Sequence, residues 1–194
     1  MSLFKVKDQL NLRGDKDRGS LGYSLSTIWG GKMQGHGRIL LVDDNPNDLE
    51  LALVAFEKSG RAPEVTVARS GQEAMRLLTR AVKPAVRAEQ TVTHLPDVVL
   101  LDLNMPQMDG LAVLEAIRAQ PGLEGLPVVI LSTSREERDI RACYKRGASA
   151  YVVKPVEFEQ FLTTLSATSD FWTRLNEHPQ PIKQPESAEA PGSN

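Results

Sequence analysis

Five short apolar runs, separated by patterns of amphipathic helix, place the strongest constraint on the fold of this chain. They occupy residues 39–42, 65–67, 98–101, 128–131 and 151–153. The runs are nearly continuous in apolar residues, which is typical of strands covered on both faces. Strands of this kind that alternate with helices predict an α/β fold with a doubly wound, five-stranded parallel sheet.

The segments between the runs carry signals of helices. We expect a first helix from Pro46, with Asn45 as its N-cap, to about Gly60. The second crossover contains no clear pattern over residues 83–94, so we expect an extended loop there. Further helices are expected from about residue 71, after Asp109-Gly110, over residues 135–146 and over residues 157–176.

Two segments of different composition flank this pattern. Residues 1–37 are rich in glycine and show neither helical nor strand periodicity over any long stretch, so we expect a flexible leader. Residues 178–194 contain four prolines among polar residues, which predicts a disordered tail. The folded domain is therefore expected over residues 38–177, including an extended last helix.

Bulk composition narrows the functional classes. A formal net charge of -2 in 194 residues offers no broad electrostatic attraction to nucleic acid or to an anionic membrane. The single cysteine, Cys143, cannot form an internal disulfide, and no apolar stretch reaches the length of a membrane span. We expect a soluble, cytoplasmic protein whose partners are neither nucleic acid nor membrane.

Polar residues follow four of the five apolar runs at the point where each run ends. Asp43 and Asp44 follow the first run, Asp102 the third, Ser132 the fourth and Lys154 the fifth. In a doubly wound sheet, ligands bind at the carboxyl ends of the strands. We therefore expect three carboxylates, a hydroxyl and an ammonium group to converge on one small site.

Three carboxylates this close would repel one another unless a cation neutralised them. Oxygen ligands without a histidine or cysteine cluster favour Mg²⁺, with Mn²⁺ as a possible substitute, and argue against zinc. Lys154 and Ser132 would add positive charge and a hydrogen-bond donor on the other side. This arrangement suits a phosphoryl group, with one carboxylate as the nucleophile.

The same residues carry a family resemblance. Over about residues 38–165 the chain resembles the receiver domain of two-component response regulators, and a finer likeness is to the single-domain regulators that partner phytochrome histidine kinases. The motifs that carry the likeness are Val42-Asp43-Asp44, Leu101-Asp102-Leu103-Asn104-Met105-Pro106, Met108-Asp109-Gly110, Ser132, Tyr151-Val152-Val153-Lys154-Pro155, Asp44-Asn45-Pro46-Asn47-Asp48 and Phe171-Trp172.

The resemblance implies a flavodoxin-like sheet with strand order 2-1-3-4-5 and a phosphoacceptor at Asp102, which would attack the phosphohistidine of a histidine kinase. Asp44, Asp102 and the backbone carbonyl of Asn104 would hold Mg²⁺ directly, and Asp43 would help through water. Lys154 would pair with a phosphoryl oxygen. The protein would then not be an enzyme, beyond catalysing its own phosphotransfer and autodephosphorylation.

The resemblance also assigns the residues that respond to phosphorylation. The Ser132 hydroxyl would move toward the phosphoryl group, and Tyr151 would turn inward behind it. Asn104 and Ser134 would tune the lifetime of the phosphoryl group. The peptide bond between Lys154 and Pro155 would be cis.

Each feature has a simpler explanation when it is taken alone, such as helix capping by Asp43-Asp44-Asn45 or a satisfied hydroxyl at Ser132. Two other functions also stay open. One is a docking or dimerisation module that keeps the receiver fold and acts independently of phosphorylation. The other is a Mg²⁺-dependent phosphohydrolase, which would need Asp-x-Asp-Gly after the first strand, whereas Asp102 follows the third.

The last helix, over residues 157–176, is longer than the strands it would cover. Its end carries Phe171 and Trp172, whose large side chains point in different directions. At least one of them is therefore expected to meet another chain. We predict a homodimer through this helix and the fifth-strand face.

Overall fold

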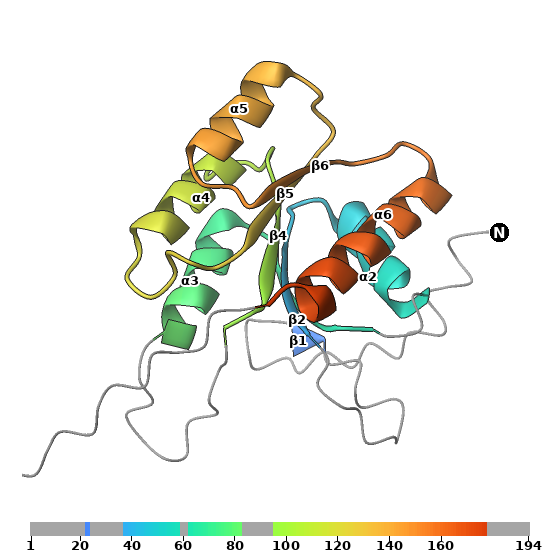
Figure 1. Cartoon of the computed structure of the whole chain (residues 1–194), viewed down its shortest axis with the longest axis horizontal. Helices are drawn as coiled ribbons and strands as arrows, with labels where there is room; N and C mark the ends of the chain where they lie inside the picture. The colour runs from blue at the N-terminus through green and yellow to red at the C-terminus, as the bar shows by residue number, and fades with distance from the viewer. Residues whose placement is uncertain (1–21, 24–36, 59–61, 83–94, 178–194) are drawn as a thin grey trace, which may run out of the picture.

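The structure, a computed structural model, describes residues 22–23, 37–58, 62–82 and 95–177. The predictions for the loop over residues 83–94 and for the tail over residues 178–194 lie outside these residues. So does most of the expected leader. The described chain forms one sheet with helices on both faces (Figure 1).

The sheet has a parallel core of five strands in the order β3-β2-β4-β5-β6, which confirms the predicted order 2-1-3-4-5. A further short strand, β1, pairs antiparallel with β3 at one edge and was not predicted. The strands are β1 (Gly22–Tyr23), β2 (Arg38–Val42), β3 (Glu64–Ala68), β4 (Val98–Asp102), β5 (Val128–Ser132) and β6 (Ala150–Val153).

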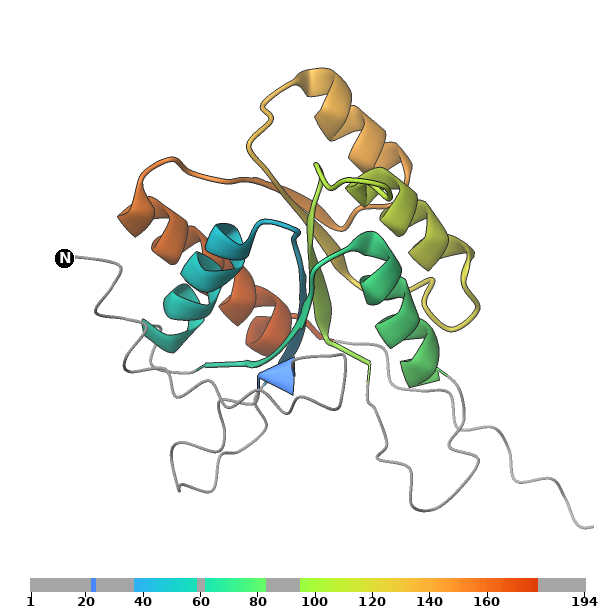
Figure 2. The ribbon, with the colours of Figure 1, turned by 180° about the vertical axis from the view of Figure 1, so that it is seen from behind.

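Helices cover the sheet in two layers. Helices α2 and α6 lie on one face, and α3, α4 and α5 lie on the other, as Figures 1 and 2 show from opposite sides. The predicted helices are therefore confirmed. Their bounds are α2 (Pro46–Lys58), α3 (Gly71–Val82), α4 (Gly110–Ala119), α5 (Glu137–Lys145) and α6 (Phe158–Asp170).

Strand β4 shows why the apolar runs are continuous. Val99 and Leu101 belong to the core beneath α3 and α4, whereas Val98 and Leu100 belong to the core beneath α2 and α6. All four side chains are fully buried. Since successive side chains point to opposite faces, a strand covered twice needs an apolar residue at every position.

Local capping positions the helices that begin beside the carboxyl ends of the strands. The Asn47 backbone N–H donates to the Asn45 side-chain oxygen at 3.0 Å, so Asn45 caps α2 as predicted. The Ala112 backbone N–H donates to the Asp109 carboxylate at 2.8 Å and caps α4 in the same way. Both caps lie in loops that leave strands carrying candidate site residues.

The last helix continues beyond α6 as a π-helical segment, η2 (Phe171–Leu175). Trp172 packs against the apolar core beneath α2 and α6, so its own domain covers part of its ring. Phe171 meets Trp172 edge to face with ring centroids 5.0 Å apart and stays 47% exposed. The helix reaches the predicted length, and it divides its two aromatic residues between core and surface.

Within the described residues, no helix combines the length and apolarity that a membrane crossing requires.

Candidate functional site

Four strands bring the predicted site residues to one edge of the sheet. Asp43 follows β2, Asp102 ends β4, Ser132 ends β5, and Lys154 follows β6. All four side chains belong to residues that are at least nine-tenths buried. Because these strands are parallel, their carboxyl ends meet at the same edge, and β2 and β4 lie side by side there.

The Lys154 ammonium group is the centre of the cluster. It donates to Asp43 Oδ2 at 2.7 Å, to Asp102 Oδ1 at 2.7 Å and to Asp48 Oδ2 at 2.9 Å. A lysine ammonium group has three hydrogens, so all of its donors are used. The structure thus confirms that an ammonium group and carboxylates from distant segments converge.

The contacts in the cluster shift the pKa values of Lys154 and Asp43. Burial alone would lower the pKa of Lys154, but its hydrogen bonds with Asp102 and Asp43 outweigh this and raise it above the ordinary lysine value. The pKa of Asp43 is raised, chiefly because burial disfavours its charged form and also because of the charge of Asp102, although its contacts with Lys154 and Asn45 lower it. One cation serves several carboxylates here, so the site retains an excess of negative charge.

The acidic residues offer a set of oxygen ligands. One carboxylate oxygen from each of Asp43, Asp44 and Asp102 lies within 4.8 Å of the others. Backbone groups hold one oxygen of two of these carboxylates: Asn45 N–H donates to Asp43 Oδ1 at 2.9 Å, and Asn104 N–H donates to Asp102 Oδ2 at 2.8 Å. Fixed, hard oxygen donors with excess negative charge fit a divalent ion such as Mg²⁺ or Mn²⁺.

The loop after Asp102 is pressed closely against the strand that it leaves. The Gly110 N–H donates to the carbonyl oxygen of Leu103 at 3.0 Å. A Cβ atom at Gly110 would lie 2.4 Å from the carbonyl oxygen of Asp102, so no other residue fits without moving this backbone. The backbone of Asn104, whose side chain is exposed, is thereby kept beside the acidic cluster.

Ser132, Ser134 and Tyr151 form a hydrogen-bonded group at the carboxyl end of β5, the strand next to the one that ends in Asp102. The Ser134 N–H donates to Ser132 Oγ at 3.1 Å, and the Tyr151 hydroxyl donates to the Ser134 carbonyl oxygen at 3.1 Å. The Ser134 hydroxyl donates to Asp139 of α5 at 2.7 Å. The residues proposed to respond to phosphorylation are therefore linked to one another and to α5.

The expected cis peptide bond between Lys154 and Pro155 is wrong, because that bond is trans. A bond that precedes proline favours trans by only about 0.5–1 kcal/mol, so the dipeptide by itself does not decide the isomer.

Asp48 is the site residue that the sequence reasoning missed. Its position three residues after the N-cap Asn45 is one where an acid is ordinarily explained by the helix dipole. Asp48 does have a local partner, because its Oδ1 accepts a hydrogen bond from the Asn45 side-chain amide at 3.0 Å. Only the fold reveals that Oδ2 contacts Lys154, which lies 106 residues away in the sequence.

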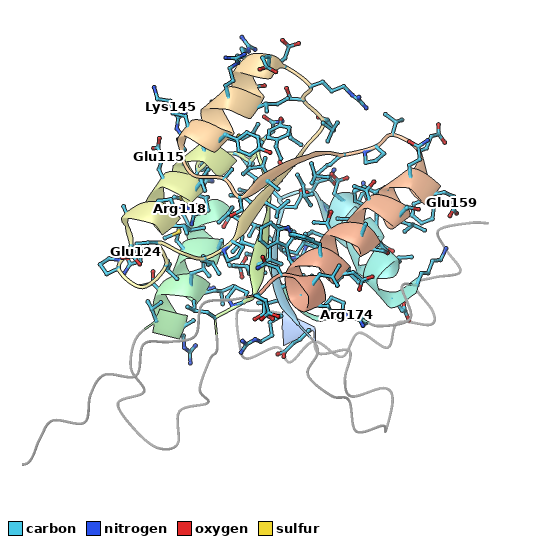
Figure 3. All side chains as sticks on the ribbon, in the orientation of Figure 1. Glu115, Arg118, Glu124, Lys145, Glu159 and Arg174 are labelled. Carbon is cyan, nitrogen blue, oxygen red and sulfur yellow. The ribbon has the colours of Figure 1, made fainter. Side chains whose placement is uncertain are left out.

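Phe171 and Trp172 lie away from this cluster. A Cβ atom on Gly37, just before β2, would meet Thr173 of η2 at 2.0 Å. The end of the helix therefore packs at the amino end of β2, whereas Asp43 lies at its carboxyl end. Figure 3 shows the neighbouring Arg174 at the same lower end of the sheet.

Comparison with known proteins identifies a family. The model of the family described as "Response regulator receiver domain" matches residues 39–166. Among curated proteins, "Probable methanogenesis regulatory protein FilR2" of Methanothrix harundinacea (strain 6Ac) is 35% identical over 143 residues. That match covers 74% of this chain and 88% of the relative.

Solved structures of similar proteins share the fold. The phosphorylated cyanobacterial phytochrome response regulator RcpA has a TM-score of 0.65 and 35% identity, with 75% of this chain and all of that chain covered. The Mn(2+)-bound form of response regulator Rcp1 has a TM-score of 0.63 and 30% identity, with 74% of this chain and 99% of that chain covered. The bacteriophytochrome response regulator AtBRR has a TM-score of 0.54 and 45% identity, with 74% of this chain and 100% of that chain covered.

Proposed function

Since this chain belongs to the response regulator receiver domain family, we propose that it accepts a phosphoryl group on Asp102 from a histidine kinase and signals through altered protein contacts. The observation that carries the proposal is the contact between Lys154 and the Asp102 carboxylate at 2.7 Å. This contact supports the proposal, because a carboxylate acting as nucleophile needs a nearby cation to neutralise the transferred phosphoryl group.

The proposed reaction balances within the site. A carboxylate oxygen of Asp102 attacks phosphorus, and the phosphorus–nitrogen bond of the donor phosphohistidine breaks. The electron pair of that bond stays on the donor nitrogen, and the donor leaves as neutral imidazole because its other ring nitrogen carries a proton. Lys154 turns its hydrogen bond from Asp102 Oδ1 to a phosphoryl oxygen, and the Ser132 hydroxyl donates to another. Mg²⁺, when held by Asp43, Asp44, Asp102 and the carbonyl of Asn104, would supply further charge neutralisation.

The test is incubation with acetyl phosphate and Mg²⁺, followed by intact mass measurement and peptide mapping. The wild type should gain one phosphoryl group, and Asp102→Asn should gain none. Asp109→Asn is the matched control, because asparagine keeps the cap of α4 and changes an exposed acid of the same loop. Unchanged phosphorylation of the Asp102 variant would refute the assignment.

The partner is proposed to be a phytochrome-type histidine kinase. The named relatives RcpA and AtBRR are phytochrome response regulators, and this chain is 35% and 45% identical to them. Phosphotransfer profiling against purified histidine kinases would test this, with the phytochrome kinases expected to transfer fastest. Equal partner binding with and without the phosphoryl group would instead favour the docking module.

We also propose a homodimer through α6 and the β6 edge of the sheet. Phe171 is 47% exposed and Leu175 is 73% exposed at the end of the last helix, and β6 is an edge strand. Since Trp172 packs on its own domain, Phe171 is the member of this pair that a second copy could contact. Sedimentation analysis should give a dimer for the wild type and a weaker one for Phe171→Ser.

A further inference from the structure

Lys154 is bound by three carboxylates, and one of them, Asp48, stands outside the proposed metal set. We propose that Asp48 is a positioning residue, which keeps Lys154 directed at the phosphoryl group when the metal ion and that group draw Asp43 and Asp102 away. The proposal rests on the proposed function and adds a residue to its site.

The three partners differ in what else they are expected to do. Asp43 and Asp102 each contribute an oxygen to the cluster that could hold a cation, together with Asp44. Asp102 would also change from a carboxylate to an acyl phosphate when it is modified, and its negative charge would then lie on the phosphoryl oxygens. Asp48 takes part in neither event, so its charge remains available to Lys154 throughout.

Asp48 is itself well anchored for this task. Its two oxygens have separate partners, since Oδ1 accepts from the Asn45 side-chain amide at 3.0 Å and Oδ2 accepts from Lys154 at 2.9 Å. Asn45 in turn caps α2 and donates its backbone N–H to Asp43. The carboxylate is thus fixed to the first turn of a helix rather than to a mobile loop.

The lysine needs such an anchor because of its own chemistry. Its ammonium group is a compact point charge on a flexible four-carbon stem, so the acceptors around it set its final direction. With two carboxylates turned to the metal and the phosphoryl group, Asp48 is the remaining acid within the described residues that contacts Lys154. Without Asp48 the ammonium group would spread over several positions, and only some of these reach the phosphoryl oxygens.

The experiment titrates the full chain with beryllofluoride, a stable analogue of the phosphoryl group, in the presence of saturating Mg²⁺. The affinity for beryllofluoride and the mobility of the Lys154 side chain, from ¹³C relaxation at Cε, are measured for the wild type, Asp48→Ala and Asp48→Asn. We expect Asp48→Ala to weaken beryllofluoride binding roughly three- to tenfold, a modest effect because Asp48 is partly exposed to solvent. Lys154 should become mobile in this variant, and Asp48→Asn, which keeps an acceptor oxygen, should fall between.

Glu50→Gln is the matched control, because it removes an acid from the same helix away from Lys154 and should match the wild type. Thermal unfolding of each variant records any loss of stability at the helix cap as a separate readout. If both Asp48 variants bind beryllofluoride within twofold of the wild type and Lys154 stays ordered, the positioning role is refuted and the proposed function stands. If the wild type binds no beryllofluoride, the proposed function fails, and the role of Asp48 fails with it.

Discussion

The hydroxyl of Tyr151 donates a hydrogen bond to the backbone carbonyl oxygen of Ser134 at 3.1 Å and so ties β6 to the loop that follows β5. The Tyr151 ring packs beside the core beneath α3 and α4, with its hydroxyl at the rim. The same loop is tied to Ser132, the last residue of β5, whose Oγ accepts from the Ser134 N–H, and β5 lies beside the strand that ends in Asp102, the proposed phosphoacceptor. Movement of Ser132 toward a phosphoryl group would therefore pull directly on the hydrogen bond that orients Tyr151.

Tyr151→Phe should lower the free energy of unfolding by about 0.5–1.5 kcal/mol, because it removes one hydrogen bond and keeps the ring. Tyr144→Phe is the control, since Tyr144 is 51% exposed and should lose little. Urea unfolding measures both. Equal losses in the two variants would mean that the Tyr151 hydroxyl contributes nothing specific.

Gly110→Ala should destabilise the chain by about 1–3 kcal/mol and slow phosphorylation, because the new methyl group overlaps the Asp102 carbonyl oxygen. Gly125→Ala offers a control in open space, where nothing lies within 4 Å of the added atom. Urea unfolding and phosphorylation by acetyl phosphate would be compared for the two. A Gly110 variant as stable and as active as the Gly125 variant would contradict the close packing.

Lys154→Met should destabilise the metal-free chain by roughly 3 kcal/mol, because the buried carboxylates of Asp43 and Asp102 lose their counter-ion. Mg²⁺ should restore part of this loss, so its effect on Tm should be larger in the variant than in the wild type. Lys145→Met removes an exposed lysine from α5 and should leave the response to Mg²⁺ unchanged. A smaller Mg²⁺ effect in the Lys154 variant would count against a shared acidic site.

Cys143 should resist alkylation in the folded chain and react readily in denaturant, because burial raises the pKa of its thiol. The raised pKa also makes the stability of the chain depend on pH. Above the ordinary thiol pKa the unfolded chain ionises first, so the stabilising contribution of the neutral thiol declines as pH rises toward the folded value. The stability difference between the wild type and Cys143→Ala should therefore narrow between about pH 8 and pH 10.

The elements were predictable because their signals are local. The apolar run of β4 reflects cover on both faces, and the caps Asn45 and Asp109 bind backbone groups two and three residues away. The position of each site residue at the end of a strand followed from the same pattern, together with the shared direction of parallel strands. Resemblance to a family then supplied roles for these residues.

The rest depended on contacts between segments far apart in the chain. Nothing near Asp48 in the sequence indicates that it shares Lys154 with Asp43 and Asp102. The trans bond before Pro155 is a choice between two isomers of similar energy. The partial burial of Trp172 depends on where the last helix crosses the sheet.

The sequence by itself therefore determined the parallel α/β sheet and the set of groups at its carboxyl edge, because hydrophobic period and capping act over a few residues. The tertiary structure decided how those groups share hydrogen bonds and charge, because the Lys154 ammonium group has three donors and takes whichever acceptors the fold brings within reach. It also decided which of Phe171 and Trp172 stays exposed, because only Trp172 packs against the core beneath α2 and α6.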